Sequence, residues 1–288
     1  MEARPNAVTQ GGELEMKVNY ETVPLDGQTW RIDETFSGMH TYAYLLEGRE
    51  RALLIDTCQG WGGLPQQVKR LTDKPVTVVH THGHLDHIGA DGAFGKAYVS
   101  TKDMAVAQEH SGHAYRRASL LGFDEELELG LSEAELDRLV HGPDGTVFLP
   151  MEPGEIFDLG GRKIEVLATP GHTPGSVCFL ERERRALYTG DTVCARGILL
   201  SLPHSCSVAC FEKSVQYLAE RLNEYDLLHP GHHEVPLHPE ILQAYIECAK
   251  AIQSGALAGD SGSAAGAACL YAAWQNIGIA YQADRIVD

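Results

Sequence analysis

The strongest constraint on this chain is a run of metal-binding side chains directly after an apolar segment. The run, residues 81–87, reads Thr-His-Gly-His-Leu-Asp-His. The preceding residues, 75–81, are rich in valine, which predicts a buried strand. Open α/β sheets place their sites where strands end at the carboxyl edge, so we expect a metal site here. The candidate ligands are His82, His84, Asp86 and His87.

Two divalent metal ions explain this run better than one. Alternate residues of a loop project in different directions, so four ligands within six positions cannot all reach one ion but can serve a pair. Imidazole and carboxylate groups together suit zinc, which is the expected metal, with iron and manganese as alternatives. The competing interpretation is a polar loop with accidental histidines, since the chain holds 14 histidines among 288 residues.

Three later segments repeat the layout of a strand, a sharp turn and a ligand-type residue. They span residues 169–176, 188–192 and 228–233, and their candidate ligands are His172, Asp191 and His232. A glycine beside each ligand lets the backbone turn tightly and approach a metal. A turn alone would explain any one segment, but their number and order favour a metal centre. His233 is the one rival to His232.

Hydrophobic patterning predicts a single domain over residues 1–288, because no linker divides the chain. Strands are expected at 15–23, 30–32, 41–46, 52–56, 75–81, 164–168, 176–180, 186–189, 226–228 and 277–287. Helices are expected at 65–71, 212–223 and 239–254, and a loop at 255–265, which is rich in Gly, Ala and Ser. The first dozen residues indicate a frayed tail. Residues 101–141 predict a mostly helical insertion.

The ligand segments, together with Asp56 in Leu-Ile-Asp-Thr, resemble the signature of the metallo-β-lactamase superfamily. The resemblance extends from Asp56 to His232. It implies an α/β (α+β) fold, a four-layer αββα sandwich in which two mixed sheets pack face to face with helices outside.

The resemblance also implies a role for each candidate ligand, and no position departs from the two-metal pattern. Asp56 matches a carboxylate that supports the ligands from behind. Asp86 and Asp191 are the expected catalytic carboxylates. The implied ligands are His82, His84 and His172 for the first ion, Asp86, His87 and His232 for the second, and Asp191 for both.

Such a centre predicts hydrolysis without a serine or cysteine nucleophile. Two ions about 3.5–4 Å apart can share a hydroxide of lowered pKa, which attacks a carbonyl. We therefore expect hydrolysis of a small-molecule ester, lactone or thioester. A mononuclear iron dioxygenase acting on a sulfur substrate is an alternative. A non-enzymatic binding module is disfavoured, because the ligand set is intact.

The resemblance separates the branches of the superfamily only in part. The commonest zinc β-lactamases carry cysteine at the position of Asp191, which disfavours β-lactam hydrolysis. Flavodiiron proteins carry a glutamate within the ligand run and add a flavin domain. Glyoxalase II and the persulfide dioxygenases carry Gly-Cys-Gly-Arg soon after the bridging aspartate, which residues 192–197 match poorly. The ligand set is similar to that of lactonases and glyoxalase II.

Three residues are candidate substrate contacts. His204 lies in a loop after Asp191, and Tyr115 and Arg116 lie in the predicted insertion, which could fold over the metals. His110 and His113 are interpreted as solvated histidines. The roles of two cysteines that follow the Asp-Thr pairs, Cys58 and Cys194, are left open, with small buried side chains as the simpler interpretation.

Charge and composition narrow the choice of partners and location. The net charge of −17 argues against nucleic acid, whose binding needs a basic surface. No apolar run approaches the roughly 20 residues of a membrane span, so no membrane partner is expected. Seven scattered cysteines without a CxxC pair indicate reduced thiols and a cytoplasmic location. The oligomeric state is left open, with a homodimer as one option.

Overall fold

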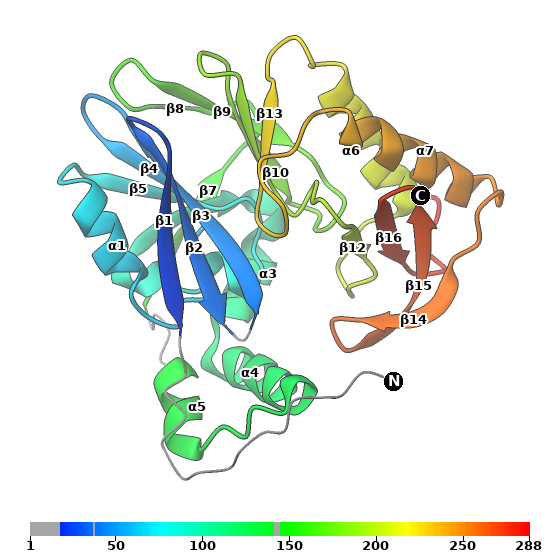
Figure 1. The fold of residues 1–288 in the computed structure, drawn as a ribbon, viewed down its shortest axis with the longest axis horizontal. Helices are drawn as coiled ribbons and strands as arrows, with labels where there is room; N and C mark the ends of the chain where they lie inside the picture. Colours follow the sequence, from blue (N-terminus) through cyan, green and yellow to red (C-terminus); the bar gives the residue numbers. More distant parts are fainter. Residues whose placement is uncertain (1–17, 37, 141–144) are drawn as a thin grey trace, which may run out of the picture.

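Two mixed β-sheets face each other in the computed structural model, which describes residues 18–36, 38–140 and 145–288 (Figure 1). The first sheet has the strand order β1-β2-β3-β4-β5-β6-β7, with β1–β4 antiparallel and β4–β7 parallel. Its strands are β1 (Asn19–Asp26), β2 (Thr29–Phe36), β3 (Met39–Glu47), β4 (Ala52–Ile55), β5 (Val76–Val79), β6 (Lys96–Ser100) and β7 (Val147–Met151).

The second sheet has the order β13-β11-β10-β9-β8, in which only β11 and β13 pair in parallel. Its strands are β8 (Ile156–Asp158), β9 (Lys163–Ala168), β10 (Val177–Glu181), β11 (Ala186–Gly190) and β13 (Leu227–Pro230). Because β9, β11 and β13 run in the same direction, their carboxyl ends meet at one edge of the sheet.

Strands β4 and β10 carry apolar side chains on both faces, because both faces of each strand are buried. Along β10, Val177 and Phe179 lie in the core between the two sheets, whereas Cys178 and Leu180 lie in the core beneath the helices. On β4, Ile55 faces the second sheet and Leu54 packs toward the outer helix. Alternate side chains of a strand point to opposite faces, so a continuous apolar run is buried on both.

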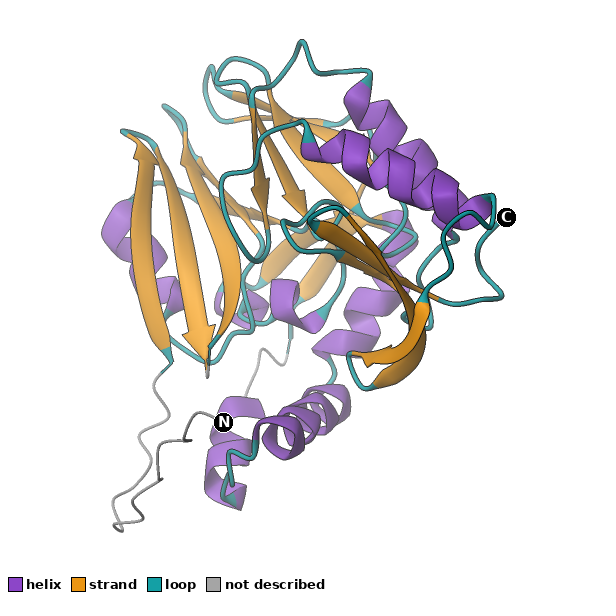
Figure 2. Ribbon diagram, turned by 45° about the vertical axis from the view of Figure 1, so that its right-hand side comes forward, coloured by secondary structure: helices purple, strands orange, loops and turns teal. Residues whose placement is uncertain are grey.

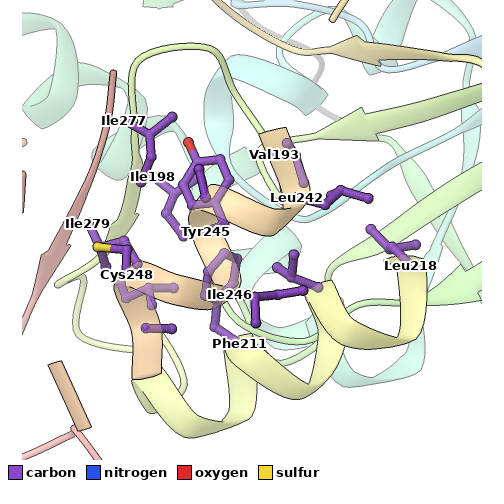
Figure 3. Close-up of a cluster of buried hydrophobic side chains, with 14 of the residues drawn as sticks. Val193, Ile198, Phe211, Leu218, Leu242, Tyr245, Ile246, Cys248, Ile277 and Ile279 are labelled. Atoms are coloured by element: carbon purple, nitrogen blue, oxygen red, sulfur yellow. The ribbon is translucent and has the colours of Figure 1, made fainter. Parts of the chain in front are cut away.

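Helices cover both outer faces, so the predicted αββα sandwich is confirmed (Figure 2). Helix α1 (Leu64–Leu71) packs on the first sheet through Leu64 and Val68. Helices α6 (Val208–Ala219) and α7 (Ile241–Gln253) cover the second sheet. Figure 3 shows this outer core, where Phe211 and Leu218 of α6 face Tyr245 and neighbouring residues of α7.

The remaining helices lie between β5 and β7 in sequence. Residues 104–140 form three helices, two of which, α4 and α5, lie below the sheets in Figure 1. Among the described residues, none of the helices combines the length and apolar character needed to cross a bilayer. The helices of this stretch are α2 (Leu85–Ile88), α3 (Met104–Ser111), α4 (His113–Leu127) and α5 (Glu133–Val140), with short 3₁₀ turns at Asp91–Ala93 and Thr101–Asp103.

The structure corrects the sequence prediction near the C-terminus. A third sheet, not predicted, has the order β12-β16-β15-β14. The loop expected at 255–265 is wrong in part, because β14 forms within it. Helix α6 begins four residues earlier than predicted, where the Ser207 side chain accepts a hydrogen bond from the Cys210 amide. The strands are β12 (Ile198–Leu200), β14 (Asp260–Ala264), β15 (Ala267–Trp274) and β16 (Ile277–Tyr281).

Three predictions fall partly or wholly outside the described residues. These are the frayed tail, residues 15–17 of the first expected strand, and residue 141 at the end of the expected insertion.

The outer core predicts a clear difference between two leucines near the end of α6. Leu218 is fully buried, whereas Leu222 is 47% exposed. Leu218→Ala should lower the free energy of unfolding by about 2–5 kcal/mol, because it leaves a cavity. Leu222→Ala should change it by less than about 0.5 kcal/mol. Urea unfolding followed by circular dichroism measures the free energy of unfolding of each variant. Equal losses in the two variants would contradict the burial of Leu218 in the outer core.

Candidate metal centre

Every candidate metal ligand lies in a connection that follows the carboxyl end of a strand. His82 and His84 come after β5, and Asp86 and His87 lie in α2 directly beyond them. The loops after β9, β11 and β13 carry the other three, which are His172, Asp191 and His232. The sandwich therefore brings together side chains that are up to 150 positions apart in the sequence.

A first cluster consists of three buried imidazoles. The Nδ1 atom of His84 lies 3.0 Å from Nε2 of His82 and 2.9 Å from Nε2 of His172. Nitrogens bound to one tetrahedral zinc ion at about 2.1 Å would lie about 3.4 Å apart, so the cluster is close to the size that such an ion needs.

A second cluster adjoins the first and combines imidazoles with carboxylates. Nε2 of His232 lies 3.1 Å from Oδ2 of Asp86 and 3.3 Å from Nε2 of His87. Asp191 lies between the clusters: its Oδ1 is 3.3 Å from His87 Nε2, and its Oδ2 is 3.6 Å from His172 Nε2. One carboxylate thus faces both groups of nitrogens.

The electrostatics of the clusters fit bound cations. Burial, reinforced by neighbouring imidazoles, holds the pKa of His82 and of His84 well below the usual range, so these rings keep free lone pairs. Burial opposes the charge on Asp191, but the imidazoles of His232 and His87 hold its pKa well below the usual range. Its Oδ1 atom is buried without a hydrogen-bond partner, which is costly unless a cation balances it.

Hydrogen bonds behind the clusters fix the orientation of the imidazoles. Nδ1 of His87 lies 2.8 Å from Asp56 Oδ2, and Asp56 also accepts hydrogen bonds from the amide and hydroxyl of Thr81. His172 and His232 each direct Nδ1 to a backbone carbonyl, at 2.7 Å. Such contacts leave Nε2 free to bind a metal and restrict the rotation of the ring.

Two buried groups with a supporting role were missed by the sequence analysis. His80 lies 2.9 Å from Asp91, and although burial opposes protonation, this carboxylate raises the pKa of His80 to about 9. Asp103 accepts hydrogen bonds from the Gly83 amide, the Thr173 hydroxyl and the Gly175 amide, each at 2.7–2.8 Å. Asp103 therefore connects the loop that carries His82 and His84 with the loop that carries His172. The sequence showed Asp103 only as an acidic residue at a helix start.

The three expected substrate contacts lie in different places. His204 touches His84 through Nε2, at the edge of the first cluster. The ring of Tyr115 stacks on His110 at 3.9 Å, and His110 in turn stacks on His84 at 5.0 Å. The interpretation of His110 as solvated is wrong, since it is 5% exposed. Arg116 lies away from both clusters, because its buried guanidinium donates hydrogen bonds to the carbonyls of Gly89 and Gln59.

Two grooves open at the second cluster. One, of about 340 Å³, runs past Ile198 and Tyr271, and the other, of about 660 Å³, runs past His40 and Phe123. A substrate lying across their junction would place its reacting bond beside Asp86 and His232 of the second cluster. Residues common to the two grooves are Asp86, Arg196, His232 and His233, of which Arg196 was not predicted.

The two cysteines near the site are buried thiols. Cys58 directs its sulfur to the Thr41 carbonyl at 3.6 Å, and Cys194 to the Gly190 carbonyl at 3.6 Å. Burial raises the pKa of both thiols well above the usual range. They are therefore protonated and poor nucleophiles.

Known proteins resemble this chain in sequence and in fold. The family model described as the metallo-beta-lactamase superfamily matches residues 37–253 of this chain. A solved metallo-beta-lactamase structure from Pontibacter korlensis superimposes with a TM-score of 0.59 and 18% sequence identity, covering 80% of this chain and 98% of that one. At this identity the structural likeness concerns the fold alone.

Two curated relatives carry the names of hydrolytic enzymes. The acyl-coenzyme A thioesterase MBLAC2 of Gallus gallus is 29% identical over 222 residues, which cover 73% of this chain and 79% of that protein. A probable polyketide biosynthesis zinc-dependent hydrolase, BaeB of Bacillus velezensis, is 24% identical over 198 residues, covering 66% of this chain and 72% of that protein.

The position of Asp103 predicts that it secures the ligand loops. Asp103→Asn replaces a carboxylate oxygen by an amide NH₂ that would face N–H or O–H donors. It should lower the free energy of unfolding by about 1–3 kcal/mol and weaken metal retention on the order of 10-fold. Metal content after dialysis against a graded chelator measures the second effect.

The matched control is Asp73→Asn, because Asp73 is an exposed aspartate. It should leave both quantities unchanged. If the two variants retain metal equally well, Asp103 does not hold the ligand loops in place.

Proposed function

The chain belongs to the metallo-β-lactamase superfamily, and from that membership we propose that it is a metal-dependent hydrolase of small-molecule thioesters and esters. One observation carries the proposal: two adjoining clusters of imidazoles and carboxylates both face Asp191, and Asp86 and His232 of the second cluster line two grooves. The relatives named as a thioesterase and as a zinc-dependent hydrolase support the reaction class and the use of a divalent metal.

We assign two ions, most simply zinc, to the two clusters. The first would be held by the three imidazoles around His84, the second by Asp86, His87 and His232, and Asp191 would contact both. Neutral imidazoles and two carboxylates match the donors that zinc prefers. Bound ions of this kind supply an activated hydroxide near neutral pH and polarise a carbonyl.

The residues of the chain bind the substrate and orient the attacking water. Asp86 lines both grooves and has a side chain that is 30% exposed, so its carboxylate can accept a hydrogen bond from that water. The acyl part and the leaving group would occupy one groove each. His204, which touches His84, and Tyr115, which stacks on His110, line neither groove and would contact only a substrate that extends past the first cluster. Cys58 and Cys194 are buried, so neither is exposed enough to act as the nucleophile.

The test is hydrolysis by protein of known metal content. The panel contains an acyl-coenzyme A, an acyl-glutathione, an aryl ester, a lactone and a β-lactam, with products separated chromatographically. We expect thioester or ester cleavage by the zinc-loaded protein, loss of activity after chelation, and recovery when zinc is returned. Hydrolysis of the β-lactam alone, or turnover that needs iron and consumes oxygen, would contradict the proposal.

Two variants separate ligand loss from general damage. Asp191→Ala should lose metal and hydrolysis together, because one carboxylate faces both clusters. His233→Ala, a neighbour of His232 that lines the grooves, should keep its metal. Equal metal loss in both variants, measured by elemental analysis, would refute the ligand assignment.

A further inference from the structure

A pair of cysteines outside the metal centre differs from every other cysteine in the chain. Five of the seven cysteines are buried, whereas Cys206 and Cys210 are partly exposed. Both lie at the N-terminal end of α6: Cys206 directly precedes the helix cap Ser207, and Cys210 lies in the first turn. Oxidants dissolved in water therefore reach this pair more easily than any other thiol of the protein.

The two thiols lie four positions apart at the start of α6 and differ in acidity. The Cys210 thiol donates a hydrogen bond to the Pro170 carbonyl at 3.8 Å, and interaction with the Cys206 side chain lowers the pKa of Cys210 to about 7, although burial opposes the shift. The same interaction raises the pKa of Cys206. A helix N-terminus also favours a thiolate. Cys210 is thus the reactive thiol and Cys206 the one that can resolve its oxidised form.

We propose that Cys206 and Cys210 form a redox-active dithiol, which hydroperoxides convert to an intramolecular disulfide, and that this disulfide disturbs the loop carrying His172. The part of the proposal that concerns hydrolysis rests on the proposed function, whereas the disulfide itself does not.

The chemistry balances with hydrogen peroxide as the oxidant. The Cys210 thiolate attacks one peroxide oxygen, the O–O bond breaks, and the departing hydroxide takes a proton to become water. Cys210 is then a sulfenic acid. The Cys206 sulfur attacks the Cys210 sulfur, the S–O bond breaks, and hydroxide leaves with the Cys206 proton as a second water. Two thiols are oxidised and one peroxide is reduced.

Hydrogen bonds connect this pair to the loop that carries His172. The Cys206 amide donates a hydrogen bond to the Gly171 carbonyl at 2.8 Å, and the Ser205 hydroxyl donates to the His172 carbonyl at 2.8 Å. On the helix side, Ser214 donates to the Pro170 carbonyl at 2.6 Å. Residues 170–172 are therefore hydrogen-bonded to α6 on one side and to residues 205–206 on the other.

Packing leaves this loop little room to adjust. A Cβ atom on Gly171 would lie only 2.9 Å from the Phe211 ring, so α6 presses directly on the backbone next to His172. A disulfide brings its sulfurs to about 2.05 Å and fixes the dihedral angle between them. Closing it draws Cys206 toward α6, and the hydrogen bonds of Cys206 and Ser205 transmit the shift to Gly171 and His172.

The disulfide is tested by peptide mapping of the metal-loaded protein treated with hydrogen peroxide. Trypsin releases residues 197–213 as one peptide, which contains no other cysteine. After oxidation this peptide should be two hydrogen atoms lighter and resistant to alkylation, and a phosphine reductant should reverse both changes. In Cys206→Ser the reaction should stop at a sulfenic acid on Cys210, trapped by dimedone. An unchanged peptide, or a disulfide elsewhere, overturns the proposal.

Coupling to the metal centre is tested by hydrolysis rate and metal content before and after oxidation. The parent should show a severalfold, reductant-reversible loss of rate or faster loss of metal to a chelator. The variant with both Cys206→Ser and Cys210→Ser should show neither, and Cys269→Ser, a buried cysteine, should behave as the parent. A parent disulfide without either effect overturns the coupling. A parent that hydrolyses nothing, yet forms the disulfide, contradicts the proposed function instead.

Discussion

The rest of the site depends on one partly buried carboxylate, with one fully buried oxygen, that two sets of imidazoles share. Asp191 sits at the end of β11, with one oxygen toward His87 and the other toward His172. Its charge is stabilised by these rings, and its Oδ1 atom has no hydrogen-bond partner of its own. Burying such a group costs several kcal/mol unless a positive charge balances it. Two cations between the clusters would supply that balance.

The need to balance the charge of Asp191 explains why four connections between elements meet at one edge of the sandwich. The connections after four strands carry the candidate ligands, and buried carboxylates join these connections to one another. Asp56 holds Thr81 and His87, and Asp103 holds the loops of Gly83 and Thr173. Each carboxylate satisfies backbone or hydroxyl donors that would otherwise be buried unpaired. Ligand geometry is thus set by the packed sheets rather than by flexible side chains.

The sequence analysis predicted features that depend on neighbouring residues. It missed features that depend on contacts between residues far apart in the chain. The ligand run was visible because four ligand-type residues stand within six positions after an apolar strand. The role of Asp103 was invisible, since its partners Thr173 and Gly175 lie at least 70 residues away. Strand β14, Asp-Ser-Gly-Ser-Ala, is an exposed edge strand without apolar alternation, so composition alone indicated a loop. Pairing with β15 overrides that local preference.

The central claim is that this edge holds two ions bridged by Asp191. Anomalous diffraction from crystals of the zinc-loaded protein, recorded on both sides of the zinc absorption edge, tests it most directly. We expect two zinc peaks about 3.5–4 Å apart, one among the imidazoles of His82, His84 and His172 and the other beside His87 and His232, with Asp191 in contact with both. A single peak at full occupancy, or a second peak without Asp191 as a ligand, would contradict it.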